Sequence, residues 1–175
     1  PWSIGQRIWT APVTTGVSMT ITYDAGARNI YVYFTDIVAY VGSTGVGTSG
    51  VLSSTATSGA ESLTLAATPA ITSEIIGSIM RDVASGTTGA TPGTGHTELY
   101  DIDHLDGSAA QFQVRPPGST STAFEWTDVG PTLVKGTAIA LEILGTSSGA
   151  ADATATPATI SMTLAVNASA LSAGG

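Results

Sequence analysis

Apolar and polar side chains alternate along much of this chain, which is the pattern of β-strands with one face in a core and the other face outside. Residues 17–23, with the sequence VSMTITY, alternate apolar and hydroxyl side chains, and residues 137–144 and 158–166 alternate similarly. Residues 30–41 differ, because β-branched and aromatic side chains fall on both faces. This last stretch predicts a central strand or an interface strand.

Shorter runs predict further strands at residues 61–66, 98–102, 111–115 and 123–127. Glycine, serine, threonine and proline separate them, and two such stretches, residues 42–59 and 85–95, have the composition of loops. Many short strands with glycine-rich turns are typical of an antiparallel sandwich or barrel. We therefore predict an all-β fold, an antiparallel and jelly-roll-like β-sandwich of about eight or nine strands.

The period of the apolar positions changes after residue 72. The residues that recur at helical spacing are Ile75, Ile76, Ile79, Met80 and Val83. Thr72 or Ser73 could cap the start of a helix, and Gly86 could close its end. Gly77 and the isoleucines lower the helix propensity of this segment. The spacing nevertheless predicts one short amphipathic helix.

The two ends of the chain differ from its middle. Four large apolar side chains crowd the N-terminal end, namely Trp2, Ile4, Ile8 and Trp9, whereas residues 168–175 are mostly small. A chain of 175 residues is long enough for one core. We predict an N-terminal arm at residues 1–12, a single β-sandwich domain at residues 13–167 and a flexible tail at residues 168–175. The four apolar residues of the arm are the predicted interface.

Charged side chains are scarce. They make up 10% of the chain, against about 25% in a typical soluble domain, and glycine, alanine, serine and threonine fill more than half of all positions. A surface of small and hydroxyl side chains suits packing against other proteins. The net charge of −8 repels phosphate backbones, so no nucleic-acid partner is expected. No apolar run approaches the roughly 18 residues of a membrane span, so no membrane partner is expected either.

The densest group of hard oxygen ligands contains Asp101, Asp103 and Asp106. An EF-hand loop would need further oxygen ligands where Leu105 and Phe112 stand. A Ca²⁺ or Mg²⁺ site of another kind is one interpretation, because these cations accept oxygen ligands in irregular loops. The interpretation that we favour is an aspartate-rich turn between two strands, with no cofactor.

No residue pattern identifies a reaction, and we do not expect an enzyme. The chain lacks cysteine and any Gly-x-Ser-x-Gly elbow. His96 and His104 would need a bend in the chain to share a metal. Glu125 and Asp128 could form a carboxylate pair of the glycosidase type, and the neighbouring Trp126 could stack on a sugar. The interpretation that we favour for this segment is the end of a strand with a core tryptophan.

Taken together, the cysteine-free and lysine-poor composition, the strand pattern and the apolar arm resemble virion structural proteins of tailed bacteriophages, particularly head decoration or cement proteins. The resemblance implies a β-sandwich protomer, commonly a homotrimer, that bridges neighbouring subunits of the major capsid protein. It also implies synthesis in the host cytoplasm and a place on the virion surface. Two alternatives remain: a carbohydrate-binding module or tail-fibre receptor-binding domain that takes a glycan, and another tail or filament subunit.

Overall fold

The computed structural model describes residues 6–11, 19–23, 40, 42–54, 58–83, 89–104, 108–130, 132–145 and 162–166. The chain divides into two units. The first comprises Pro1–Ile8 with Ile37–Gly149, and the second comprises Trp9–Asp36 with Ala150–Gly175. The domain boundaries expected near residues 12 and 167 stay predictions.

The second unit contains two strands, β1 (Met19–Tyr23) and β10 (Met162–Val166). They pair in parallel, with Met19 opposite Met162 and Tyr23 opposite Val166. Both strands lie inside segments whose alternation predicted strands, so these two predictions are confirmed.

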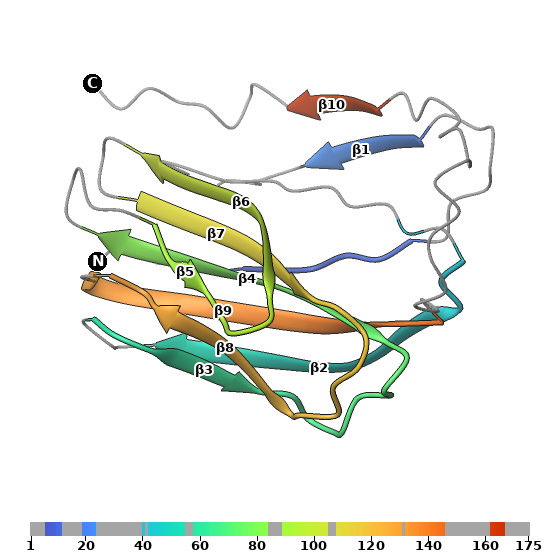
Figure 1. Cartoon of the computed structure of the whole chain (residues 1–175). Coiled ribbons are helices and arrows are strands. Elements are labelled where there is room, and N and C mark those ends of the chain that lie inside the picture. The colour runs from blue at the N-terminus through green and yellow to red at the C-terminus, as the bar shows by residue number, and fades with distance from the viewer. Residues whose placement is uncertain are drawn as a thin grey trace. The chain divides into compact units, whose positions relative to one another are not determined.

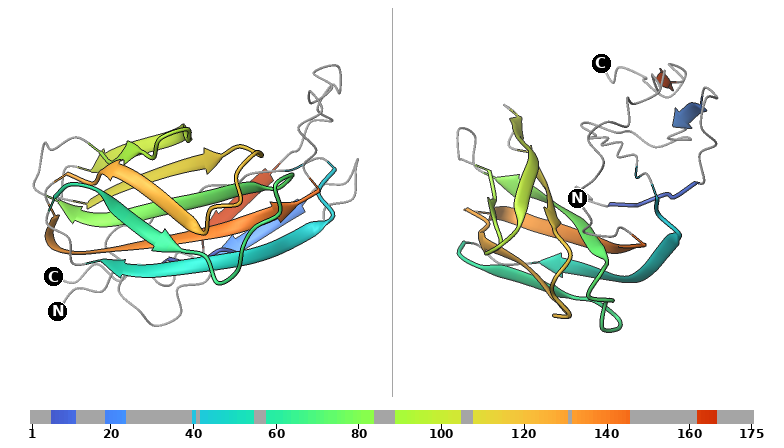
Figure 2. Two further views of the ribbon diagram at one scale, coloured as in Figure 1. Left: turned by 60° about the horizontal axis from the view of Figure 1, so that its bottom comes forward. Right: turned by 45° about the vertical axis from the view of Figure 1, so that its right-hand side comes forward.

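The first unit contains the other eight strands. These are β2 (Gly45–Ser54), β3 (Glu61–Thr64), β4 (Glu74–Val83), β5 (Thr91–Pro92), β6 (Thr97–His104), β7 (Ser108–Arg115), β8 (Ala123–Asp128) and β9 (Thr132–Leu144). A five-stranded sheet has the order β2-β9-β4-β7-β6, and a three-stranded sheet has the order β3-β8-β5. All neighbours in both sheets are antiparallel. Figures 1 and 2 show the two sheets as two layers.

The prediction of an all-β antiparallel sandwich is therefore confirmed, whereas the jelly-roll order of the strands stays a prediction. Ten strands occur among the described residues, slightly more than expected. The predicted strands at residues 61–66, 98–102, 111–115, 123–127 and 137–144 are confirmed as β3, β6, β7, β8 and β9. Of residues 30–41, only Tyr40 is described, and it lies outside any strand. The strand predicted there is thus outside the described residues.

The predicted helix near residues 72–86 is wrong. This segment contains β4, the middle strand of the five-stranded sheet, which pairs with β9 on one side and β7 on the other. Ile75 and Ile79 point into the space between the two sheets, and Ile76 belongs to a separate apolar cluster. A strand with apolar side chains on both faces can reproduce helical spacing by chance.

The glycine-rich residues 42–59 were predicted to form a loop, but they contain the strand β2. A Cβ atom on Gly50 would lie 2.6 Å from the carbonyl oxygen of Thr64 and 2.7 Å from Leu63 Cδ1. Glycine is needed here because the neighbouring segment approaches the strand closely, and not because the chain turns. The second predicted loop, residues 85–95, likewise contains the short strand β5.

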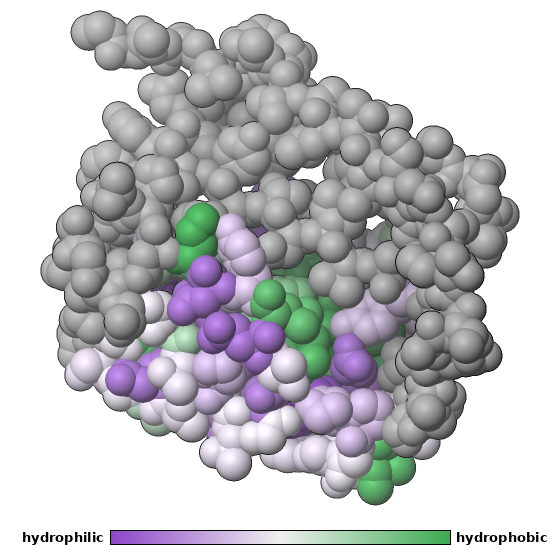
Figure 3. All heavy atoms as spheres, turned by 45° about the horizontal axis from the view of Figure 1, so that its top comes forward, coloured by the Kyte–Doolittle hydropathy of each residue, from purple (hydrophilic) through white to green (hydrophobic). Residues whose placement is uncertain are grey.

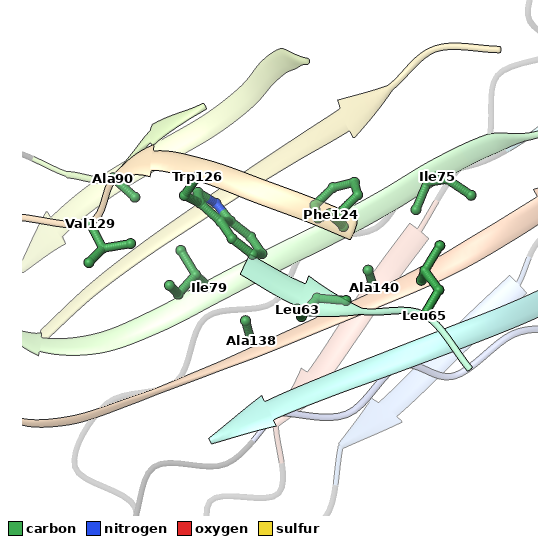
Figure 4. Packing of buried hydrophobic residues seen from close by; sticks show 10 residues of the cluster. All are labelled: Leu63, Leu65, Ile75, Ile79, Ala90, Phe124, Trp126, Val129, Ala138 and Ala140. Carbon is green, nitrogen blue, oxygen red and sulfur yellow. The ribbon is translucent and has the colours of Figure 1, made fainter. Parts of the chain in front are cut away.

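The core lies between the two sheets (Figure 4). Its buried members are Leu63, Leu65, Ile75, Ile79, Ala90, Phe124, Trp126, Val129, Ala138 and Ala140. Phe124 and Trp126 project from β8 and meet edge to face, with ring centroids 5.3 Å apart. The small side chains of Ala138 and Ala140 on β9 lie in the same cluster and leave room for these large rings between the two layers.

Candidate functional site

The five-stranded sheet carries buried apolar side chains on both of its faces. One face contributes to the core between the sheets. The other carries a second cluster, formed by Ile76, Phe112, Leu141 and Ile143. In a two-layer sandwich the outer face of a sheet is usually polar and in contact with water. Here the side chains of the cluster are 5–9% exposed, so this apolar face is already covered within the chain, and we call it the second face.

Strand β7 shows which way its side chains point. Phe112, at 8% exposure, belongs to the second face, whereas Gln111 and Gln113 are almost fully buried on the side of the core. Trp126 Nε1 donates a hydrogen bond of 2.7 Å to Gln111 Oε1, and Gln113 Nε2 donates one of 2.8 Å to the carbonyl oxygen of Glu125. The polar face of this strand thus points towards the core between the sheets, and its apolar face points away from that core.

Arg115 extends this set of contacts between β7 and β8. Its guanidinium group donates hydrogen bonds of 2.6 Å to the carbonyl oxygen of Ala123 and 2.8 Å to that of Ser121. Side chains at three alternate positions of β7 therefore bind β8 or the residues just before it. These contacts satisfy buried polar groups, whose burial would otherwise destabilise the fold. They also link β7 of the five-stranded sheet to β8 of the three-stranded sheet.

A short N-terminal segment binds across the second face. Gln6 Nε2 donates hydrogen bonds to the carbonyl oxygen and to the hydroxyl of Thr137 on β9, the latter over 3.0 Å. The Ser78 hydroxyl, on β4, donates a hydrogen bond to Gln6 Oε1. Ile8 packs against the apolar cluster of the same face. One glutamine thus bridges two neighbouring strands, and an isoleucine two residues later covers apolar surface.

Tyr40 provides another contact with this face. It packs against the same cluster, and its hydroxyl donates a hydrogen bond of 2.5 Å to Glu74 Oε1 at the start of β4. Burial, together with the hydrogen bond and the negative charge of Glu74, raises the pKa of Tyr40. Tyr40 therefore stays protonated and acts as a donor at physiological pH.

The second face continues to an exposed edge at β2. Val46 and Val51 lie opposite Ile143 and Ile139 of β9, so they share the face of those residues. Val51 is 75% exposed and Val46 is 44% exposed. On the side of the molecule drawn in Figure 3, separate hydrophobic areas lie among hydrophilic residues and residues of intermediate hydropathy. Exposed apolar side chains that adjoin a buried apolar cluster are typical of a protein contact surface.

The predicted interface residues are only partly described. Trp2 and Ile4 lie outside the described residues, Ile8 packs on the second face, and Trp9 is 73% exposed. The assignment of these residues to an interface stays a prediction. Sequence reasoning missed Gln6, because nothing in the local pattern points to partners on β4 and β9.

The predicted cation site also stays a prediction. Asp101 and Asp103 lie on β6, Asp101 is exposed, and Asp106 lies outside the described residues. Within the described ranges, no group of three His, Cys, Asp or Glu residues is placed to hold a metal ion. β6 and β7 form an antiparallel pair on either side of residues 105–107. This pairing agrees with the favoured interpretation, a turn between two strands.

Trp126 is fully buried in the core, so its suggested role as an exposed sugar platform is wrong. Its ring fills the space between the sheets, where burial of a large aromatic side chain is most favourable. Glu125 and Asp128, on the same strand, are both exposed. His96 stacks on Phe124 at a centroid distance of 4.6 Å.

Comparisons of the chain with protein-family models, with curated proteins and with solved structures found no match. Among the residues that the structure describes, no helix is long and apolar enough to span a membrane.

Proposed function

We propose that this chain is a structural subunit of a bacteriophage virion, of the head decoration or cement type, which stabilises the head by bridging neighbouring capsid subunits. The observation that carries the proposal is the pair of exposed valines on the edge strand β2, Val46 at 44% and Val51 at 75% exposure, which extend the second face to the edge of the five-stranded sheet. In a monomer, apolar side chains at a sheet edge stay exposed to water, which is unfavourable. In an assembly subunit, the same side chains are buried in a contact with another protein.

The composition supports the same proposal. With one lysine and four arginines, the chain carries few of the long charged side chains that lose rotamer freedom when a surface is covered. Serine and threonine lose much less, so each square ångström of contact costs less conformational entropy. Repeated over many symmetry-related positions, such contacts add to the stability of a shell. The proposed partners are weakly charged surfaces of the major capsid protein and further copies of this chain, which would form a homotrimer.

The first test is the mass of the protein in solution, measured by light scattering at several concentrations with and without calcium. We expect an oligomer that calcium does not affect. Val51→Lys places a charge on the second face and should shift the mass towards that of the monomer. Ile71→Lys is the matched control, because Ile71 is also exposed, at 59%, but lies in a turn outside the sheet. Its mass should remain that of the native protein.

The second test addresses the virion directly. An antibody raised against the purified protein should label the heads of phage particles that contain it, as seen by electron microscopy. Label confined to tails would overturn the decoration assignment in favour of a tail subunit. A monomer that binds glycans in an array, with no label on particles, would favour the carbohydrate-binding alternative.

A further inference from the structure

We infer that the site on the second face that holds Gln6 and Ile8 also accepts these residues from a second copy of this chain, so that assembled copies exchange their N-terminal segments. The inference rests on the proposed assembly function and names the partner of its contact surface. In the single chain, the segment occupies its own site. In the assembly, the same hydrogen bonds and apolar contacts form between neighbours.

The contacts of the segment are specific and distant in sequence. Gln6 lies 131 residues from Thr137 and 72 residues from Ser78, and both atoms of its amide group are used. An amide that donates to β9 and accepts from β4 fixes the segment in one register across the two strands. Because these contacts involve only residues 6–8 and the sheet, an identical segment from another copy would satisfy them equally well.

The covalent connection does not tie the segment to its own sheet. The boundary between the two units falls between Ile8 and Trp9, and the chain returns to the first unit only at Ile37. Residues 9–11 are exposed and have no regular secondary structure. The segment is thus joined to the strands that hold it only through 28 residues of the other unit (Trp9–Asp36). A segment that binds its own sheet is favoured only by its effective concentration near that sheet, and this concentration falls as the connection becomes longer. In a crowded shell, the local concentration of segments from neighbouring copies can be as high.

Charge is compatible with exchange. Within residues 6–11 the only charged side chain is that of Arg7, which is exposed, whereas the whole chain carries a net charge of −8. A positively charged segment is attracted towards a second acidic copy. The net charge of −8 on each copy opposes association, and salt screens this repulsion.

The absence of cysteine makes a crosslinking test direct. Ile8→Cys and Val114→Cys place thiols at two positions that pack on the same apolar cluster. Two single variants, distinguished by tags of different size, are co-expressed and treated with a short bismaleimide reagent. We expect a covalent dimer that contains both tags. Ile8→Cys paired with Ile71→Cys is the control and should give a severalfold lower yield.

The double variant, Ile8→Cys with Val114→Cys in one chain, reports binding in cis. Crosslinks within this chain, with no dimer from the paired single variants, would overturn the exchange.

Light scattering of the untreated protein then separates the two proposals. Oligomers without a mixed dimer would leave the proposed assembly function standing, whereas monomers at all concentrations would overturn both proposals. Gln6→Leu in the Ile8→Cys chain removes the hydrogen bonds and should reduce the mixed dimer severalfold. An unchanged yield in this variant would also overturn the inference.

Discussion

The side-chain amide of Gln6 donates a hydrogen bond of 3.0 Å to the hydroxyl of Thr137, which lies 131 residues further along the chain. Through this contact and the bond from Ser78, the beginning of the chain becomes part of a surface formed by β4 and β9. Neither residue type marks a functional site by itself. Their juxtaposition defines where the N-terminal segment binds, and it leads to the first prediction.

Gln6→Leu should lower the free energy of unfolding by about 1–3 kcal/mol, because it leaves the half-buried hydroxyls of Ser78 and Thr137 without their glutamine partner. Urea denaturation followed by tryptophan fluorescence measures this change. Arg7→Gln is the control, since Arg7 is exposed, and it should change the stability by about 0.5 kcal/mol or less. Equal stabilities of the native protein and Gln6→Leu would show that the segment does not bind where the structure places it.

Gly77→Ala should destabilise the sandwich by about 1–3 kcal/mol through overpacking. A Cβ atom at this position would lie 2.5 Å from the Phe124 ring and 3.0 Å from the carbonyl oxygen of Ile139. The ring is fixed in the core, so it cannot move away easily. Gly136→Ala provides a comparison on β9, because its Cβ atom would come no closer to a neighbouring atom than 3.1 Å, the distance to Arg81 Cγ. Thermal unfolding should show a clearly larger loss for Gly77→Ala.

The charged form of Glu142 should stabilise the folded protein, and this stabilisation should be lost in acidic solution. Burial disfavours its charged form, but hydrogen bonds from the backbone N–H groups of Thr48 (2.8 Å) and Ala70 (2.7 Å) outweigh this effect and lower the pKa of Glu142 below its ordinary value of 4.5. Because the folded-state pKa is the lower one, the stabilisation is fully present above pH 4.5 and is lost as the pH falls through the folded-state value.

Glu142→Gln should therefore cost about 1–3 kcal/mol at neutral pH and much less near the acid limit of the folded state. Denaturant midpoints at a series of pH values test this expectation. Glu125→Gln alters an exposed carboxylate and should have an effect of about 0.5 kcal/mol or less at each pH. A difference for Glu142→Gln that stays constant down to low pH would contradict the role given to its charge.

His96 should make the protein less stable in mildly acidic solution. Burial lowers the pKa of His96, and the positive charge of Arg115 adds to this effect, although Gln113 and Glu125 partly oppose it. Its Nδ1 atom is buried without a hydrogen-bond partner, so a proton added there would find no acceptor. Since the folded-state pKa lies below the ordinary value of 6.5, stability should fall as the pH drops below 6.5.

His96→Phe retains an aromatic ring against Phe124 and removes the titration. The difference in unfolding free energy between pH 7.5 and pH 5.0 should be smaller in this variant than in the native protein, even if the variant is less stable overall. The comparison isolates His96 because every other titratable group is the same in both proteins. An identical pH dependence would exclude His96 as the cause of any acid sensitivity.

The period-two alternation of residues 17–23, 61–66, 137–144 and 158–166 correctly predicted β1, β3, β9 and β10, because the two faces of a strand are a local property of the chain. It failed at β4, where Ile75, Ile76 and Ile79 satisfy both strand and helix periods because both faces of the strand are apolar. It also failed at β2, where glycine was interpreted as a loop former. Gly50 is glycine because Thr64 approaches it, and that approach depends on the packing of one segment on another.

The sequence by itself determined that this protein is an all-β, weakly charged chain of many short strands, since these properties follow from composition and from the spacing of neighbouring residues. Only the tertiary structure decided which side of each strand faces the core. In β7 the polar Gln111 and Gln113 point inward and Phe112 points outward, because Trp126 and the backbone of β8 supply partners for the buried amides. The second face, and the binding of Gln6 across it, exist only once strands distant in sequence lie side by side.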